Sequence, residues 1–599
     1  MQLLVVDLTE ERLDWAEINP QTVHDYLGGR GLGARYLYDN LPPGTDPLGL
    51  NNILSFWTSP LMATGALSMV KLCGVTRSPL TGTILMSLMG GAMGPRLRMA
   101  GADAVVLLGM ARHPVYLLIT QGHASLHSAE HLWGLDTRQT TGILNKELNL
   151  KGMEVACIGP AGERGVLFAS IMHNGDAMAR GGIGAVMGSK KLKAIVAHGS
   201  QQPPVAEPTR LKTVIAALAK SYKESDAVKA FGRYGTTSHV DDENYFGIYP
   251  TRNFQSGYFD LHKRVNADEL YTHHVTRRLT CFACPVRCRR EAQVKEDATA
   301  GLVTEGPEYE TLWSFGGNCG NANLESIIAA NDLCLLYGLD TISTGMVISF
   351  AMECFEAGLL PPHLCDGMAL TFGNYKAMLS LIHKIGQRQG LGDLLAQGTY
   401  RAAQVIGQGS NHFAMQVKGL ELAGYDPRGA KGMALGYATS PRGGCHERGF
   451  LTGEVFGNPP GIRRLEYEGK GALVKITQDI VAVKDALGFC VLSSAGTSLD
   501  AMAEMFTAVT GWSTTTSDLL LAGERICNLE RLFNLREGFT RSDDNLPTRL
   551  LEEAIPGANG EPQVVDLECM LDDYYMARGW DTEGRPTQST LERLGLWMK

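Results

Sequence analysis

The stretch Cys281-Phe282-Ala283-Cys284-Pro285-Val286-Arg287-Cys288 places three cysteines within eight residues of a 599-residue chain. A fourth, Cys490, follows 202 positions later (490 − 288) at the end of the segment Asp485–Cys490. The Cys-x2-Cys-x3-Cys spacing is typical of an iron–sulfur site rather than of a paired zinc knuckle. A structural zinc site and buried free thiols are the alternatives. Cys490 would complete four-thiolate ligation and hold together two segments that are distant in the sequence.

The composition describes an ordinary folded protein with one unusual feature. Hydrophobic residues make up 44% of the chain and charged residues 20%, as in soluble globular proteins. A chain of 599 residues is too long for one core, so we expect two to four domains. The 70 glycines suggest many tight turns and close backbone approaches, as around a large cofactor. The net charge of −9 argues against a nucleic-acid partner.

The sequence shows no signal for a membrane or for export. No run of 18 apolar residues occurs, and the stretch from Met346 to Leu360 is interrupted by Glu353 and Glu356. The segment Met1–Asp7 lacks a basic region followed by a hydrophobic core. An odd count of 13 cysteines without such a signal argues against a disulfide framework. We therefore expect a cytoplasmic protein without membrane insertion.

The pattern of the sequence changes after its first third. The polar, proline-rich segment His198–Pro208 is the best candidate for a linker, and helical periodicity follows it. We expect a β-rich domain over residues 1–200, and helical domains over residues 211–417 and 418–599. Short apolar, β-branched runs predict strands before the linker, at Leu3–Val6, Ala104–Gly109, Val115–Ile119 and Leu192–Val196.

Motifs spread along the chain indicate its family. They are Val75–Gly82, Arg180–Lys190, Glu305–Thr311, Gly338–Asp340, Tyr425–Met433, Ala438–His446, Asp485–Cys490 and Asp572–Asp581. With these motifs in this order, the chain resembles the tungsten-containing aldehyde:ferredoxin oxidoreductase family over nearly its whole length. The resemblance implies an α+β fold, in which an N-terminal β-sheet domain forms the base for a pterin cofactor and two mainly α-helical domains cover it.

The resemblance also implies the cofactors. The family binds tungsten through two pyranopterin dithiolenes, whose four sulfurs satisfy a soft metal without a side-chain ligand; molybdenum would suit the same sulfurs. Cys281, Cys284, Cys288 and Cys490 are then expected to ligate a [4Fe-4S] cluster. The protein supplies position, electrostatics and an exit for electrons.

Two aspartate–glycine motifs are where the family holds its pterins. Asp485 is expected to accept hydrogen bonds from pterin ring nitrogens, while Cys490 in the same loop ligates the cluster. In the other motif, the family usually has aspartate where this chain has Leu335, so one pterin is expected to be held differently. For Asp340 in that motif, a helix-terminal cap is the alternative role. The remaining candidates for cofactor binding are Arg180, Gly181, Gly182, Gly338, Leu339, Gly488 and Phe489.

A magnesium ion that joins the pterin phosphates is a further implication, and two positions depart from the family pattern. Lys71 stands where the family commonly has arginine, which keeps the charge but loses the planar guanidinium. Leu88 stands where the family commonly has a supporting asparagine, and leucine offers no oxygen to a hard cation. We expect water or a backbone carbonyl to substitute, or the ion to bind more weakly. The glycine-rich segment Gly28–Gly33 is expected to support the pterin base.

The acid–base candidates are Glu308, Glu310 and His446. A carboxyl group in a dry pocket has a raised pKa and can move protons near neutral pH, as histidine does without help. The family places one glutamate and one histidine beside the metal, and the sequence does not decide between the two glutamates. The alternatives are a capping or solvated glutamate and a buried histidine bonded to the backbone. Tyr425 and Arg442 are further candidates for the pocket.

Five arginines surround the cysteine motif in an otherwise acidic protein. Their simplest role is to neutralise the negative charge of a cluster. The sharper hypothesis is a docking face for an acidic ferredoxin, because complementary charge speeds encounter, and reversing Arg289 and Arg290 would then slow electron transfer. The arginines are Arg277, Arg278, Arg287, Arg289 and Arg290.

The leading hypothesis for the function is oxidation of an aldehyde to a carboxylic acid. Electrons would pass singly to ferredoxin or to an iron–sulfur partner subunit, and no convincing dinucleotide fingerprint points to NAD. One alternative is a same-fold catalytic subunit that reduces an acid or an aromatic acyl-thioester. The other is a non-catalytic electron-relay subunit, against which Asp485, His446 and Glu308 argue. The resemblance also implies a homodimer or a larger assembly.

Overall fold

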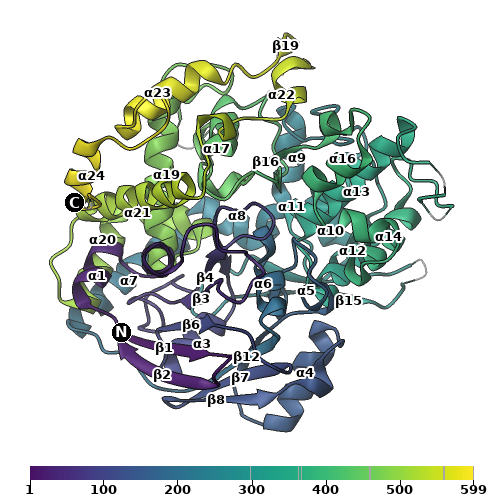
Figure 1. Ribbon diagram of the computed structural model, residues 1–599. Coiled ribbons are helices and arrows are strands. Elements are labelled where there is room, and N and C mark those ends of the chain that lie inside the picture. The colour runs from purple at the N-terminus through teal and green to yellow at the C-terminus, as the bar shows by residue number, and fades with distance from the viewer. Residues whose placement is uncertain (297–298, 362, 366, 458–459, 558–559, 598–599) are drawn as a thin grey trace.

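The computed structural model shows an α+β protein, as predicted, in which two six-stranded sheets form the N-terminal part (Figure 1). It describes residues 1–296, 299–361, 363–365, 367–457, 460–557 and 560–597. The strand orders are β2-β1-β6-β3-β4-β5 and β11-β10-β9-β12-β7-β8. The bounds are Gln2–Asp7 (β1), Arg12–Glu17 (β2), Leu54–Trp57 (β3), Leu72–Arg77 (β4), Ile84–Met89 (β5), Ala104–Leu108 (β6), Val115–Thr120 (β7), His123–Ser128 (β8), Glu154–Cys157 (β9), Ile171–His173 (β10), Asp176–Met178 (β11) and Leu192–His198 (β12).

The strands expected from the sequence are confirmed, because β1, β6, β7 and β12 occupy the four predicted runs. β1 pairs in parallel with β6, and β12 pairs in parallel with β7. Side chains of β1 alternate between two cores: Leu3 belongs to one, and Leu4 and Val6 to another that also contains Leu117 of β7. This period-2 alternation packs the two sheets against each other through apolar side chains.

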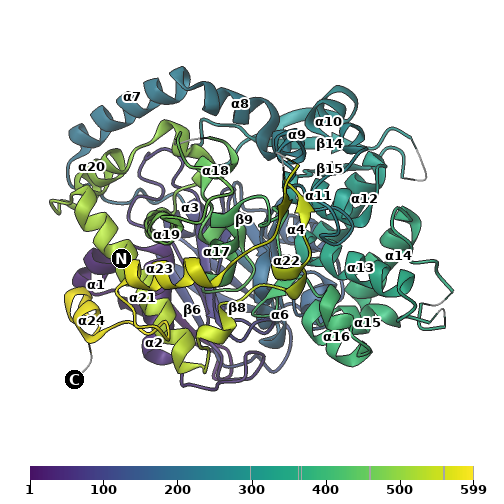
Figure 2. The ribbon, with the colours of Figure 1, turned by 90° about the horizontal axis from the view of Figure 1, so that it is seen from above.

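Helices dominate the rest of the chain and cover the sheets (Figures 1 and 2). The first of them, α7 (Pro208–Glu224), begins directly after the expected linker, and its leading proline suits a helix start. The helices around the site are α2 (Gly29–Asn40), α9 (His239–Tyr245), α11 (Tyr309–Phe315), α12 (Leu324–Tyr337), α13 (Thr341–Glu356), α17 (Lys431–Thr439), α19 (Lys470–Leu487) and α21 (Thr516–Arg536).

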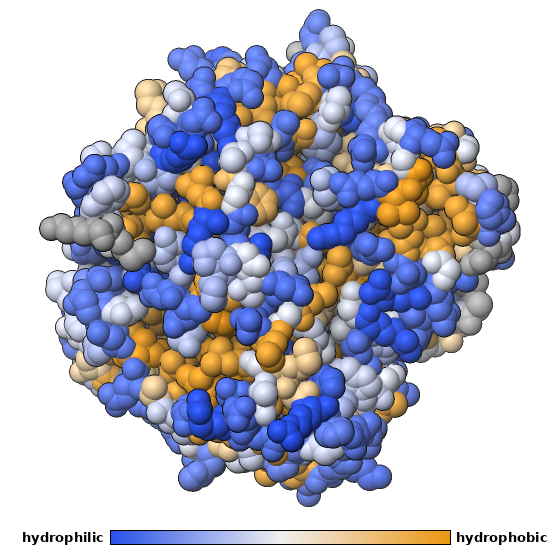
Figure 3. Space-filling view, viewed as in Figure 1, coloured by the Kyte–Doolittle hydropathy of each residue, from blue (hydrophilic) through white to orange (hydrophobic). Residues whose placement is uncertain are grey.

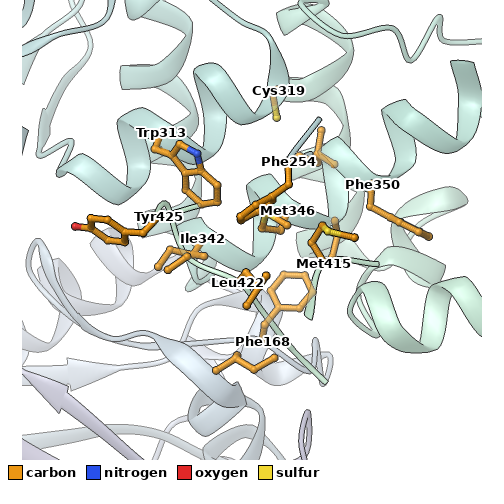
Figure 4. Packing of buried hydrophobic residues seen from close by; sticks show 14 of the residues in the cluster. Phe168, Phe254, Trp313, Cys319, Ile342, Met346, Phe350, Met415, Leu422 and Tyr425 are labelled. Carbon is orange, nitrogen blue, oxygen red and sulfur yellow. The ribbon is translucent and has the colours of Figure 1, made fainter. Parts of the chain in front are cut away.

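The helical part has a large apolar core, to which Leu80 and Phe168 of the N-terminal part also contribute (Figure 4). α13 is central to it: its residues from Ile342 to Cys354 are all buried, and Met346 lies near Phe254 and Trp313, whereas Phe350 lies on the side of Met415. Apolar residues all round a helix mark a buried helix in a large domain. Among the described residues, no helix combines the length and the apolar character needed to cross a membrane.

Glycines let α2 approach the C-terminal end of α19 closely. A Cβ atom on Gly29 would lie 2.5 Å from the carbonyl oxygen of Asp485, and one on Gly28 would lie 2.8 Å from that of Ala486. Real Cβ atoms do not approach carbonyl oxygens this closely, so larger residues would push the two helices apart. The Gly28–Gly33 segment therefore packs against the last turn of α19, which contains Asp485.

A small antiparallel sheet carries the cysteine motif. It has the order β13-β14-β15, with bounds Val275–Leu279, Arg289–Gln293 and Val303–Glu305, and the three clustered cysteines lie in the connection from β13 to β14. On the face shown in Figure 3, polar and apolar residues alternate over most of the surface. A larger apolar area covers α16 (Thr399–Ile406), where Tyr400 and Val405 are exposed.

Candidate redox site

The two aspartate–glycine motifs dock on the sheet domain in the same way. Gly338 ends α12 and Gly488 ends α19, both in the left-handed conformation that glycine favours. The next residues form equivalent backbone bridges, Leu339 with Ala169 and Phe489 with Met69. The Asp340 N–H then donates to Phe168, and the Cys490 N–H to Ser68. The tertiary structure thus places Asp340 and Cys490 at matching points of two similar helix ends.

The four predicted cluster cysteines come together. Burial raises the pKa of the Cys288 thiol, and the charges of Cys490, Cys281 and Cys284 raise it further. Burial also raises the pKa of Cys490 to about 11, against the opposing charge of Lys71. In the described part of the chain, no three His, Cys, Asp or Glu side chains gather as ligands of one ion. The four thiols act on one another electrostatically and come from the β13–β14 connection and the end of α19, which is compatible with ligation of a [4Fe-4S] cluster.

Lys71 lies beside these cysteines. Its backbone N–H donates to the Gly488 carbonyl at 2.9 Å. Burial works against its charge, but Cys490, Asp176 and Cys281 together raise the pKa of Lys71 above its usual value. Leu88 faces Cys73 across β4 and β5 and packs on an apolar core. The magnesium ion stays a prediction.

The expectation that Arg289 and Arg290 form an exposed docking face was wrong. Arg289 is largely buried, with Nη1 2.6 Å from Asp176 and 3.7 Å from the Cys281 sulfur, and its Nε binds Glu305. Arg290 is fully buried and donates to Glu308 at 2.9 Å. Buried charged groups are retained only when they are paired. We therefore infer that these two arginines stabilise the loop that contains the cysteines. The other arginines of the motif are exposed: Arg277, Arg278 and Arg287.

Asp485 is buried between two guanidinium groups. Arg30 Nη1 lies 3.0 Å from its carboxylate, and Arg448 forms a second ion pair with the same oxygen. Glu530 of α21 holds Arg30 in place with two hydrogen bonds of 2.6 and 2.7 Å. A cavity adjoins this group, lined by Arg30, Arg448, Ser440, Gln478, Glu530 and Arg531. Sequence reasoning missed Arg448 and Glu530, and only the position of Arg448 two residues after His446 could have drawn attention to it.

Asp340 caps α13, as its alternative role predicted. Its carboxylate accepts from the backbone N–H groups of Ile342 and Ser343 at 3.1 and 3.3 Å. It also pairs with Arg180, whose Nη1 donates to the Gly444 carbonyl at 2.9 Å. Gly181 and Gly182 follow Arg180 with positive φ angles, which glycine adopts without strain. Arg180 thus connects the sheet domain to α13, which begins directly after Asp340.

Leu335 lies in the last turn of α12, and its backbone carbonyl accepts a hydrogen bond from the Thr137 hydroxyl.

Glu310 and His446 form a largely buried pair. His446 Nδ1 lies 3.5 Å from Glu310 Oε1, and neither atom has a hydrogen-bond partner among the described residues. Glu310 Oε2 accepts from the Gly424 N–H at 3.0 Å. Burial raises the pKa of Glu310 to about 8 and lowers that of His446 to about 3. Near neutral pH the carboxyl is therefore mostly protonated and the imidazole is neutral.

The structure separates the two glutamates that the sequence left equivalent. Glu308 is half exposed at the start of α11 and binds Arg290 and Thr236, near the cysteine loop. Glu310 alone lies beside His446. The Tyr425 ring is 5.4 Å from the His446 ring, and Arg442 donates to the Met86 carbonyl of β5 at 2.6 Å.

Several buried polar atoms near these groups have no hydrogen-bond partner in the described residues. Buried polar atoms are nearly always bonded, so such a set is expected where a polar cofactor binds. The pterin groups of a tungsten cofactor offer donors and acceptors of this kind, and the residues present fit it. The atoms are Glu310 Oε1, Ser440 Oγ, Arg442 Nε, His446 Nδ1 and Arg448 Nε.

Comparisons with known proteins show similarity along the whole chain. Models of the aldehyde ferredoxin oxidoreductase N-terminal domain and of domains 2 and 3 match residues 3–199 and 213–596. A tungsten-containing aldehyde ferredoxin oxidoreductase of Thermococcus kodakarensis is 40% identical over 99% of this chain and 98% of its own length. The WOR-like subunit of an aliphatic sulfonate oxidoreductase of Pyrococcus furiosus is 30% identical over 99% of this chain and 96% of its own. A solved structure, the active-site complex BamBC of benzoyl coenzyme A reductase with 1,5-dienoyl-CoA, has a TM-score of 0.86 and 26% identity, covering 99% of this chain and 96% of that one.

Proposed function

Because the chain belongs to the aldehyde ferredoxin oxidoreductase family, we propose that it oxidises aldehydes to carboxylic acids and passes the electrons singly to ferredoxin or an iron–sulfur partner subunit. The observation that carries the proposal is a short connected path of functional groups. His446 pairs with Glu310, Arg448 in the same turn binds Asp485, and Asp485 precedes Cys490 by five residues. This path leads from the acid–base pair to the end of α19, which is followed by a candidate cluster ligand.

Glu310 and His446 are the groups that we assign to proton handling. Neutral His446 can orient the aldehyde or its hydrate by a hydrogen bond, and ionised Glu310 can accept a proton from it. The rings of Tyr425 and Phe450 lie 5.4 and 6.2 Å from the His446 ring. They form an apolar wall that keeps water from the pair, which favours the raised pKa of the carboxyl.

The cofactor-binding groups lie on two sides of this pair. When bound, the tungsten bis-pyranopterin supplies the two-electron oxidation. Asp485 with Arg30 and Arg448 would hold one pterin, and Arg180 with Asp340 would hold the other. Both sets pair a buried carboxylate with guanidinium groups, whose remaining donors suit phosphate and pterin acceptors. Cys281, Cys284, Cys288 and Cys490 would hold the cluster.

A same-fold catalytic subunit that works reductively is the second candidate. The observation that favours it is the similarity to the BamBC complex of benzoyl coenzyme A reductase over nearly the whole chain. The 40% identity to aldehyde ferredoxin oxidoreductases, against 26% to BamBC, makes aldehyde oxidation the leading proposal.

An anaerobic substrate panel tests the proposal. We expect purified protein to contain tungsten or molybdenum with iron, and to reduce benzyl viologen with aliphatic or aromatic aldehydes. Iron without tungsten or molybdenum would instead identify an electron-relay subunit. Inactivity with every aldehyde, combined with reduction of an acid or an aromatic acyl-thioester by reduced viologen, would favour the second candidate.

The exposed arginines give a prediction about the electron acceptor. Reversing Arg278 and Arg287 to glutamate is expected to lower the rate constant for reduction of an acidic ferredoxin about tenfold and to weaken its salt dependence, because complementary charge speeds encounter. Activity with benzyl viologen serves as the control and should not change. Equal ferredoxin kinetics in variant and wild type would contradict a docking role for these arginines.

We also propose a cytoplasmic enzyme that works as a homodimer or with an iron–sulfur subunit. Among the described residues, no two cysteines form a disulfide, which suits a reducing compartment. The similarity to a WOR-like subunit and to BamBC supports association with a partner chain.

A further inference from the structure

A second buried histidine–glutamate pair lies in α9, outside the groups assigned above. His239 Nδ1 and Glu243 Oε1 are 3.9 Å apart, one helical turn from each other. Glu243 is 0% exposed and His239 is 6% exposed. Neither Glu243 oxygen, nor His239 Nδ1, has a hydrogen-bond partner among the described residues. A carboxyl left in this state costs free energy, which suggests a role other than stability.

The second pair adjoins the first through two tyrosines. The Tyr309 ring lies 5.6 Å from the His239 ring and 5.4 Å from the Tyr425 ring, and Tyr425 in turn lies 5.4 Å from His446. Figure 4 shows the Tyr425 hydroxyl directed away from the other labelled residues of the apolar core. The two tyrosines therefore stand between the two histidine–glutamate pairs.

A peptide group also connects Glu310 with this layer. The Gly424 N–H donates to Glu310 at 3.0 Å, and the Gly424 carbonyl accepts from the Tyr309 hydroxyl at 2.5 Å. The charges of both Glu310 and Glu243 act on Tyr309 and on Tyr425. Glu243 and Glu310 thus face one shared buried region.

α9 has both buried and solvent-exposed acidic residues. Asp242, directly before Glu243, is exposed, and its charge acts on Glu243 together with that of Glu310. Arg464 supplies a positive charge that also acts on Glu243. A carboxyl that interacts with both a buried acid and a surface acid is suited to pass a proton from the site toward solvent.

We propose that Glu243 transfers the protons released by aldehyde oxidation from the Glu310–His446 pair to Asp242 and solvent. The inference rests on the proposed function. In the balanced reaction, R–CHO + H2O gives R–COO⁻ + 3 H⁺ + 2 e⁻: a C–O bond to water forms, the aldehyde C–H bond breaks, and the two electrons reduce the oxidised iron–sulfur carrier. The protons must leave a largely buried pair, and Glu243 with His239 offers a second titratable pair beyond Tyr425 and Tyr309.

The variant Glu243→Gln tests the proposal, because it keeps the shape and removes the transferable proton. With holoenzyme, an aldehyde that the wild type oxidises and saturating benzyl viologen, kcat is expected to fall about 10- to 100-fold with KM unchanged. The solvent deuterium isotope effect on kcat is expected to increase, because proton transfer becomes limiting. Glu243→Asp should recover part of the rate. If Glu243 had only a structural role, the isotope effect would stay the same in Glu243→Gln, and Glu243→Asp would not recover the rate.

Infrared spectroscopy gives a readout that does not depend on activity. Burial and the neighbouring Asp242 raise the pKa of Glu243 well above its usual value, so the wild type at neutral pH should show the carbonyl band of a protonated carboxyl group that Glu243→Gln lacks. Asp241→Asn is the matched control: it removes a carboxylate of the same helix that binds Asn266 and Lys263, and it should keep wild-type kcat.

The outcomes separate this proposal from the one on which it rests. An active wild type whose kcat and isotope effect are unchanged in Glu243→Gln overturns the relay alone. An infrared spectrum without a band assigned to Glu243 also overturns it. A wild type that oxidises no aldehyde refutes the proposed function, and the relay with it.

Discussion

Replacing Glu310 with glutamine is expected to lower kcat/KM for aldehydes by about 10²- to 10⁴-fold, the range typical of a general acid–base group. This corresponds to about 3–5 kcal/mol of transition-state stabilisation. Glutamine keeps the hydrogen bond from the Gly424 N–H but cannot accept a proton beside His446. Steady-state kinetics with benzyl viologen as acceptor measure the effect.

The pH dependence of kcat/KM tests whether Glu310 acts as a base. Because burial raises the pKa of Glu310 to about 8, its basic form is scarce at pH 7 and becomes dominant as the pH rises through 8. The kcat/KM of the wild type should therefore rise with pH up to about that value, since kcat/KM reports groups of the free enzyme. Glu310→Gln should lose this rise.

Glu308→Gln is the matched control for Glu310→Gln. Glu308 lies two residues away, binds Arg290 and is half exposed. Its replacement should leave the pH profile in place. If Glu308→Gln abolished the rise and Glu310→Gln kept it, the assignment of the two glutamates would be reversed.

Replacing Cys490 with serine is expected to remove the cluster or leave it incomplete. The loss of a ligand should lower turnover at least ~100-fold, with ferredoxin and with viologen alike, because changes even beyond the ligands cost 10- to 100-fold. Iron content and the electron paramagnetic resonance signal of the reduced cluster check the result directly. The melting temperature should also fall, since metal binding adds to folding free energy and a cluster held by Cys490 would join the segment after α19 to the β13–β14 connection.

Cys569→Ser is the control for this variant. Cys569 is exposed and lies in α23 (Glu568–Arg578), away from the cysteine loop. It should keep wild-type iron, turnover and stability. Full iron content in Cys490→Ser would show that the fourth ligand comes from another group.

Much of the fold could be predicted from the sequence because its signals are local. Apolar, β-branched runs predicted β1, β6, β7 and β12, and proline at the end of a polar segment marked the start of α7. The Cys281–Cys288 spacing brings three thiols together within one connection. The Asp485–Cys490 motif ends a helix in a glycine turn that its own sequence favours.

The sequence could not decide between Glu308 and Glu310, nor show which arginines are exposed. Glu308 precedes α11 with an extended backbone whereas Glu310 lies in its first turn, and one glutamate meets Arg290 while the other meets His446. Arg289 and Arg290 follow Cys288 directly, yet Asp176, Glu305 and Glu308 bury them.

The sequence by itself therefore predicted the fold class and the family correctly, and it singled out the four cysteines proposed as cluster ligands, because these signals lie within short segments. The tertiary structure alone decided the charge partners and the burial of the site groups. Arg30 and Glu530 are 500 residues apart and form one buried ion pair, and Asp485 lies between Arg30 and Arg448. Protonation depends on desolvation and on the nearest charges, and both are set by contacts between distant segments.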